Sequence, residues 1–130
     1  MKIAGVVVRV LLGLLFLFAS ITYWFELITP PPMTGAIQTF NDGLEASVYL
    51  MPLVKSIELV CGIALVIGRF VPLATVLIAP IIVNIVCVHA FMAPDGLPVA
   101  LFAALAHAFV AYQHRESYAP LFEAKAPARG

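Results

Sequence analysis

Two ionisable residues, Lys55 and Glu58, lie inside a long apolar run of the sequence, SVYLMPLVKSIELVCGIALVIG (47–68). Residues three positions apart share one face of a helix, so the ammonium and the carboxylate can form an ion pair. A charge at the centre of a bilayer costs about 2.5–3.5 kcal/mol on insertion scales. Charged residues within a span therefore usually face a polar interior, where they pair or mark a functional site. Lys55 and Glu58 are the first candidates for a ligand-binding or proton-accepting site.

Three more polar residues, Asn84, His89 and His107, fall in the next two apolar runs. At 1.5 Å of rise per residue, Glu58, Asn84 and His107 should lie roughly 12–15 Å below one membrane surface, with Lys55 at roughly 8–10 Å. His89 should lie near that surface. These depths predict a small polar pocket with Glu58, Asn84 and His107 at its floor and His89 at its mouth. Glu58 would accept a proton or a cation, and His107 would donate a hydrogen bond or relay a proton.

The same residues also have a purely structural interpretation. Lys55 and Glu58 would then form a buried ion pair, and a hydrogen bond between Asn84 and His107 would fix the register of two helices. Gly62, one turn after Glu58, allows a neighbouring helix to approach closely.

Other chemistries find little support in the sequence. His89 and His107 differ by roughly 10 Å in expected depth, which argues against a shared haem, and no local spacing of metal ligands occurs. There is no CxxC, phosphate loop or dinucleotide fingerprint, so no catalytic residue can be assigned. Cys61 and Cys87 lie in apolar runs, where we expect inert core thiols.

The composition indicates a polytopic membrane protein. Of 130 residues, 63% are hydrophobic and 11% are charged, whereas soluble domains are about 45–50% apolar and about 25% charged. The net charge is zero, which gives no reason to expect a nucleic-acid partner. The expected surroundings are the lipid bilayer.

Four runs are long enough to cross a membrane: 4–27, 47–68, 71–92 and 98–113. Short connections make neighbouring helices antiparallel. We therefore predict an all-α, integral-membrane four-helix bundle over residues 1–115 and a polar cytoplasmic tail over 116–130. The first run continues too far for a signal peptide and contains Arg9, so we interpret it as a retained span.

Prolines and small residues indicate where these runs begin, bend or pack closely. Residues 33–40 are predicted to form a short interfacial helix and Asn41–Gly43 a turn. The second span begins either near Gly43, with a kink at Pro52, or later, with Pro52 in its first turn. Pro80 predicts a kink in the third span. Alanines at helical spacing in the fourth span suit either a homodimer or packing within one bundle.

The basic residues predict the orientation. Lys2, Arg9, Arg69, Arg115, Lys125 and Arg129 all fall on one side of the predicted topology, whereas the first and third loops contain only acidic charges. By the positive-inside rule, both termini are cytoplasmic, which places the chain as a multi-pass protein of the inner (plasma) membrane.

The ordered combination of motifs resembles the DoxX family of small bacterial membrane proteins over about residues 1–115. It comprises an apolar first span, a proline-containing loop, Lys55-x-x-Glu58-x-x-x-Gly62-x-x-Leu65-x-x-Gly68-Arg69-Phe70-Val71-Pro72-Leu73, and Pro80-x-x-x-Asn84 with His89. His107 has no place in this pattern. The resemblance implies a four-helix bundle and an association with sulfur-compound:quinone oxidoreductases and other membrane redox complexes.

We therefore expect a small accessory subunit of a quinone-linked redox complex, rather than an enzyme acting alone. Its pocket would bind a small molecule or a quinone headgroup, and a redox subunit would be its partner. One alternative is an assembly or scaffolding protein whose ion pair only stabilises the bundle. Another is a small proton-coupled transporter component that uses Glu58.

Overall fold

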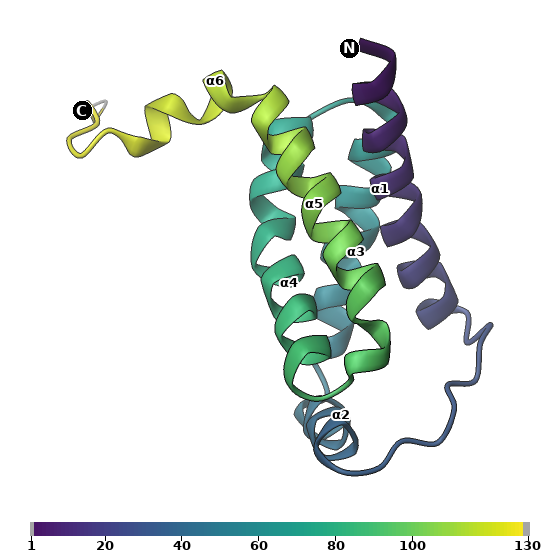
Figure 1. Cartoon of the computed structure of the whole chain (residues 1–130). Helices are drawn as coiled ribbons and strands as arrows, with labels where there is room; N and C mark the ends of the chain where they lie inside the picture. Colours follow the sequence, from purple (N-terminus) through teal and green to yellow (C-terminus); the bar gives the residue numbers. More distant parts are fainter. Residues whose placement is uncertain (1, 129–130) are drawn as a thin grey trace.

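A computed structural model describes residues 2–128, and it places four long helices side by side as an antiparallel bundle (Figure 1). The long helices are α1 (Lys2–Trp24), α3 (Leu50–Ile67), α4 (Val71–Phe91) and α5 (Leu97–Gln113). The shorter elements are α2 (Ala36–Ser47), η1 (Pro94–Gly96), α6 (Arg115–Tyr118) and η2 (Ala119–Phe122). No strand occurs within residues 2–128. The predicted all-α architecture is confirmed.

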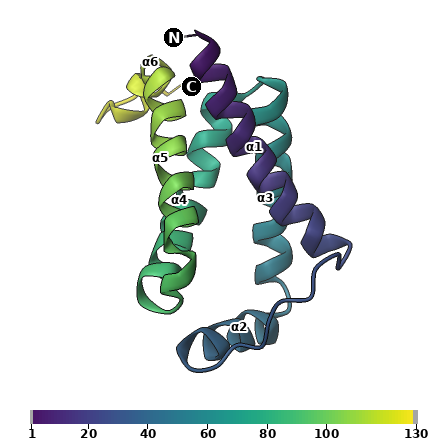
Figure 2. The same cartoon turned by 45° about the vertical axis from the view of Figure 1, so that its right-hand side comes forward.

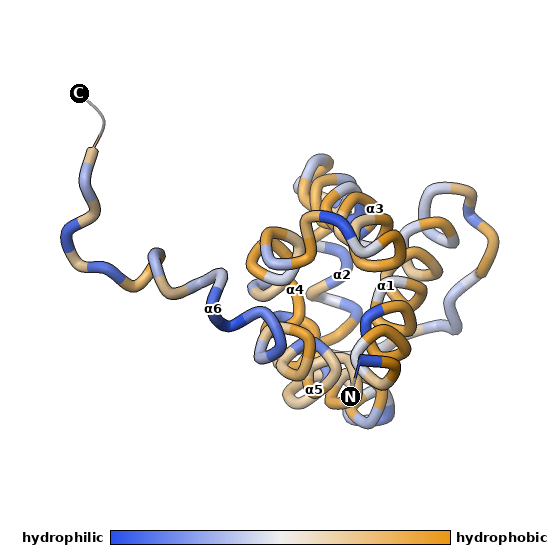
Figure 3. Tube along the Cα trace, turned by 90° about the horizontal axis from the view of Figure 1, so that it is seen from above, coloured by the Kyte–Doolittle hydropathy of each residue, from blue (hydrophilic) through white to orange (hydrophobic). Residues whose placement is uncertain are grey.

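The four long helices are suited to a bilayer in both length and polarity. Each is long and apolar enough to span a membrane, provided that α5 is taken together with η1 as Pro94–Gln113. Large apolar side chains such as Phe18, Val60 and Leu105 are more than half exposed on the outside of the bundle. Figure 3 looks down the bundle axis, and most of the chain in the four long helices is coloured as hydrophobic there. Such a surface is stable against lipid tails, so the helices contact the bilayer.

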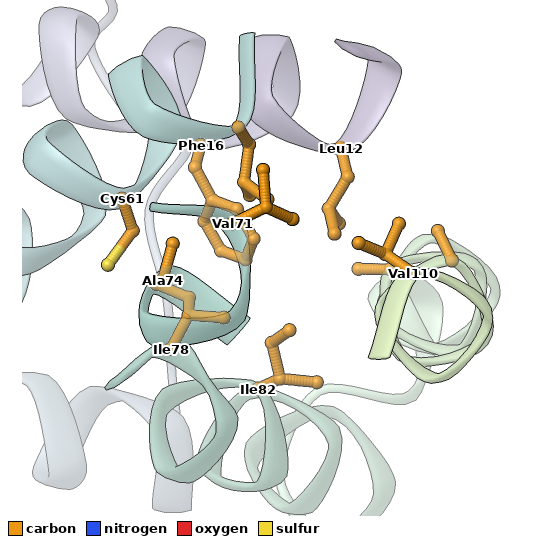
Figure 4. Close-up of a cluster of buried hydrophobic side chains, with 11 residues drawn as sticks. Leu12, Phe16, Cys61, Val71, Ala74, Ile78, Ile82 and Val110 are labelled. Carbon is orange, nitrogen blue, oxygen red and sulfur yellow. The ribbon is translucent and has the colours of Figure 1, made fainter. Parts of the chain in front are cut away.

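A core of buried apolar side chains holds the helices together (Figure 4). Leu12 and Phe16 from α1 meet Leu65 from α3, Ile78 from α4 and Val110 from α5, and each is at most 2% exposed. Three alanines of α5 (100, 103 and 106) are also buried. At least part of the alanine stripe therefore packs within one bundle. Cys61 is buried in this core, but Cys87 is exposed, so the prediction of a core thiol is wrong for Cys87.

Helices α1 and α3 approach each other closely at a point where two glycines face each other. A β-carbon on Gly13 would lie 2.9 Å from the carbonyl oxygen of Gly62, and one on Gly62 would lie 3.0 Å from that of Gly13. Two turns nearer the α2 end, the Ser20 hydroxyl donates a 2.8 Å hydrogen bond to the backbone carbonyl of Lys55. This contact fixes α3 against α1 at the residue that carries the ammonium group.

The turn between α3 and α4 is short and tightly bonded. Gly68 adopts a left-handed conformation (φ 75°), and its N–H donates to Ala64 at 2.9 Å, which ends α3. The side chain of Arg9 reaches across from α1 and donates from Nε to the carbonyl of Leu65, also at 2.9 Å. A cation at the C-terminal end of a helix complements its unpaired carbonyl groups.

The region before α3 differs from the sequence prediction. Asn41–Gly43 is not a turn but lies within α2, and the chain bends at Val48 (φ 69°) and Tyr49 instead. Pro52 then lies in the first turn of α3, where a missing N–H leaves no helical bond unmade. Of the two starts considered for this span, the later one is confirmed. Helix α2 lies crosswise at the end of the bundle far from the termini (Figure 2).

The segment after α5 leaves the bundle sideways, at the end that also holds the N-terminus (Figure 1). It comprises α6 and η2, and the hydroxyl of Tyr118 is hydrogen-bonded to the hydroxyl of Thr75 on α4. Leu121 and Phe122 are exposed. The first part of the expected polar tail is therefore helical and partly apolar.

Candidate functional site

All four long helices and α2 border one cavity of about 660 Å³. Its wall is mainly apolar, with Phe16 from α1, Leu44 from α2, Met51 from α3, Ile81 from α4 and Val99 from α5. The polar residues that line it are Asn41, Lys55, Glu58, Asn84 and His89. Small-molecule sites in proteins typically have volumes of about 300–1,000 Å³ and combine an apolar wall with a few polar groups. The cavity therefore has the size and character of a ligand site.

Lys55 and Glu58 form an ion pair in the wall of this cavity. Lys55 Nζ lies 3.0 Å from Glu58 Oε2, and the two side chains are 15% and 4% exposed. The contact is not aligned as a hydrogen bond, so buried Oε2 accepts none from the described residues. A carboxylate can accept about four hydrogen bonds. Much of the acceptor capacity of Glu58 is therefore unused by the protein.

Asn84 lines the same cavity from α4. It lies one helical turn after Pro80, which also borders the cavity. Because proline has no N–H, the carbonyl of Val76 receives no bond from position 80 within the helix. The carboxamide of Asn84 is exposed, and no hydrogen bond joins it to another residue in the described part of the chain. It offers both a donor and an acceptor to whatever occupies the cavity.

His89 lies at the end of α4 nearest to η1. Its Nδ1 lies 2.8 Å from the carbonyl of Ile85. A carbonyl only accepts hydrogen bonds, so Nδ1 carries a proton and Nε2 of the neutral ring is an acceptor. The ring packs against Gly96, where a β-carbon would lie 2.5 Å from Nε2. Only glycine at position 96 leaves room for the imidazole in this place.

His107 lies elsewhere, so the prediction that it shares a floor with Glu58 and Asn84 is wrong. Its Nε2 lies 2.8 Å from the backbone carbonyl of Thr75 and donates to it, and the predicted bond to Asn84 is not formed. It lines a second, smaller cavity of about 340 Å³ between α4, α5 and the C-terminal segment, together with Tyr118 and Leu121. Depth along a helix does not determine the direction of a side chain around it.

Two parts of the site escaped the sequence analysis. Ser20 is fully buried and holds the Lys55 backbone in place. The sequence feature that could have indicated this role is a polar residue one turn after Phe16 in an otherwise apolar run. Helix α2 supplies Phe40, Asn41 and Leu44 to the cavity wall, and its amphipathic sequence indicated an interfacial position but not a covering role. Among residues 2–128, no cluster of three His, Cys, Asp or Glu side chains is arranged to hold a metal ion.

Comparison with known proteins shows the family and nothing finer. No curated protein and no solved structure matches this chain. The sequence model of the DoxX family matches residues 4–91, from the beginning of α1 to the end of α4. This match is shorter than the resemblance over residues 1–115; α5 and His107 lie outside it. Four of the five candidate residues, Lys55, Glu58, Asn84 and His89, fall within it. The chain, with its four apolar helices and a match over most of its length, belongs to the DoxX family.

Proposed function

We propose that this protein binds a quinone-type molecule in the cavity between its helices and serves as a small membrane subunit of a redox complex. The observation that carries the proposal is the buried ion pair of Lys55 and Glu58 in the wall of a mainly apolar cavity. Burying two charges is costly unless further partners satisfy them, and membrane proteins keep such groups mainly where they function. A ligand with a polar head would supply those partners.

The residues present can bind the headgroup of a quinone in its oxidised form, with carbonyl oxygens, and in its reduced form, with hydroxyl groups. Lys55 and Asn84 provide N–H donors for carbonyl oxygens, and Glu58 and His89 provide acceptors for hydroxyl groups. The apolar wall, with residues such as Phe16 and Ile81, would surround a ring or the beginning of an isoprenoid tail. A quinone supplies two-electron redox chemistry when bound. The chain itself would orient the ring and hold protons at Glu58 and His89.

We further propose that the termini face the cytoplasm in the inner membrane. Basic residues lie towards the end of the bundle that holds the N-terminus: Lys2 and Arg9 on α1, Arg69 in the turn between α3 and α4, and Arg115 on α6. Asp42 and Glu45 lie on α2 at the other end. Basic residues are retained on the cytoplasmic side during insertion. The cavity then lies in the half of the membrane away from the cytoplasm, and α2 lies along that surface. Fusing a cytoplasm-active reporter to the C-terminus tests this orientation.

The test of the binding site is quinone content and saturable binding in protein purified in detergent. Replacing Asn84 by leucine, which has a similar volume, removes a polar group from the cavity and should weaken binding about tenfold, the value of one hydrogen bond that is left unmade. The control is His107→Ala, because His107 lies outside this cavity. Absence of quinone and of saturable binding in folded wild-type protein overturns the proposal. A loss caused by His107→Ala alone would place the site in the second cavity.

A scaffolding role is the second candidate, and one observation favours it. The Lys55–Glu58 contact lies within a single helix, next to the Ser20 hydrogen bond that joins α1 to α3. A scaffold requires a stable bundle but no ligand. Exchange of both charged residues for apolar ones should leave a scaffold functional, whereas it should abolish binding in a redox subunit.

A further inference from the structure

We propose that the cavity prefers the reduced, hydroxyl-bearing form of its ligand, a hydroquinone, over the oxidised quinone. This inference rests on the proposed function and adds the chemical form that the site recognises. The inference depends on the acceptor atoms of Glu58 and His89, which receive no hydrogen bond from the described residues.

Glu58 is the residue that sets the preference. The side chain of Glu58 is only 4% exposed. Its only polar partner in the described chain is Lys55 Nζ, which lies 3.0 Å from Oε2 but is not aligned for a hydrogen bond. A carboxylate in this state needs a donor. A quinone carbonyl has none, and its oxygen would instead bring lone pairs towards a negative charge. A hydroxyl donates to Glu58 with its hydrogen and accepts from Lys55 with its oxygen, so one group satisfies both members of the pair.

His89 makes the same demand from another helix. Because its Nδ1 proton is committed to the carbonyl of Ile85, the neutral ring presents Nε2 as an acceptor. The site therefore contains acceptors on both α3 and α4, in addition to the donors Lys55 and Asn84. The donors can serve the oxygens of either form of the ligand, but a quinone offers no hydrogen to the two acceptors. A hydroquinone carries two hydroxyl donors at opposite ends of its ring.

Three ligands that share one ring separate the two forms: a short-chain benzoquinone, its hydroquinone of nearly equal size, and the dimethyl ether of that hydroquinone, which is larger by two methyl groups. Binding is measured anaerobically in detergent by competition or calorimetry. We expect wild-type protein to bind the hydroquinone at least about tenfold more tightly than the quinone, as for a hydrogen bond to a charged group. The ether, which cannot donate, should bind no better than the quinone.

The Glu58→Gln variant tests the residue directly, because it replaces one acceptor oxygen by an NH₂ donor with almost no change in shape. The preference should fall to within about twofold, as expected when a charged acceptor is lost. The matched control is Glu45→Gln, an exposed glutamate on α2 that does not line the cavity; it should keep the wild-type preference. If Glu58→Gln does not fold, the comparison of hydroquinone with quinone in wild-type protein still decides.

Equal binding of quinone and hydroquinone by wild-type protein overturns this inference and leaves the proposed function standing. A preference that survives in folded Glu58→Gln also overturns it. Failure of folded wild-type protein to bind any of the three ligands overturns both this inference and the proposed function.

Discussion

The backbones of Gly13 and Gly62 cross so closely that a β-carbon on either residue would lie within 3.0 Å of the carbonyl oxygen of the other. This crossing fixes the distance between α1 and α3. It therefore also fixes the position of Glu58, one turn before Gly62 on the same helix. Small residues that let backbones approach are a common basis of helix association in membranes.

The crossing predicts a large difference between two glycine substitutions. Gly62→Ala should destabilise the protein by roughly 1–3 kcal/mol, because the added methyl group would crowd the backbone carbonyl of Gly13, at 3.0 Å, and the side chain of Leu17. Gly43→Ala in α2 is the control, since no atom lies within 4 Å of its added β-carbon. It should leave stability unchanged or raise it by about 0.5–1 kcal/mol. Unfolding in detergent, followed by circular dichroism, measures both. Equal stabilities would contradict a tight α1–α3 crossing.

Arg9 should contribute measurably to stability through the end of α3. Arg9→Met removes the hydrogen bond from Nε to Leu65 and the cation beside the helix C-terminus. We expect the free energy of unfolding to fall by about 1.5 kcal/mol. This is the lower end of the range for hydrogen bonds that involve charged groups, because the Arg9 side chain is only half-buried. Lys2→Met, at an exposed position on the same helix, should change stability by less than about 0.5 kcal/mol. The same unfolding assay applies, and similar losses for both variants would refute the specific role of Arg9.

Replacing one member of the Lys55–Glu58 ion pair should destabilise the protein strongly, whereas replacing both members by apolar residues should change its stability little. Lys55→Met alone leaves the buried Glu58 carboxylate without its partner, which costs about 3–5 kcal/mol in buried pairs; the partial exposure of Lys55 favours the lower end. The double variant Lys55→Met/Glu58→Leu should be close to wild type in stability. Thermal unfolding of the two single variants and the double variant completes the cycle. A double variant no more stable than the singles would contradict this account.

Filling the cavity should abolish ligand binding without unfolding the bundle. Ala100 is buried on α5 and lines the cavity, so a phenylalanine side chain there would occupy part of its 660 Å³. We expect Ala100→Phe to weaken quinone binding by more than about tenfold, since the ligand and the ring compete for the same space. Ala108→Phe, on an exposed face of the same helix, is the control. Unchanged affinity in folded Ala100→Phe would show that the ligand binds elsewhere.

The hydrogen bond between Tyr118 and Thr75 should help to hold the C-terminal segment against α4. Tyr118→Phe removes the hydrogen bond to Thr75; a bond worth about 1 kcal/mol implies roughly fivefold more frequent local opening. Tryptic cleavage after Arg115 should accelerate accordingly. Tyr112→Phe keeps the ring face that packs under Arg115, at 4.4 Å from the guanidinium carbon, and should cleave like wild type. Equal rates for all three proteins would show that other contacts hold the segment.

The sequence by itself determined the features that depend on local spacing. The four helices follow from the length of the apolar runs, because backbone groups in lipid must bond within a helix. The Lys55–Glu58 pair follows from a three-residue separation on one helix, which brings the side chains together whatever the rest of the fold does. Close approach at Gly62 follows from the absence of a side chain.

Only the tertiary structure decided what surrounds those residues. The spacing predicts His107 at the depth of Glu58 and Asn84, yet it bonds to the carbonyl of Thr75, nine residues before Asn84 on α4 and outside the cavity. The placement and rotation of α5 depend on the packing of all its neighbours, which spacing along one helix cannot give. The start of α3 was open between two positions because a proline is tolerated in a first turn and also causes kinks in helix interiors. The place of α2 across the cavity depends on long-range contacts of Phe40 and Leu44, which a short amphipathic pattern cannot specify.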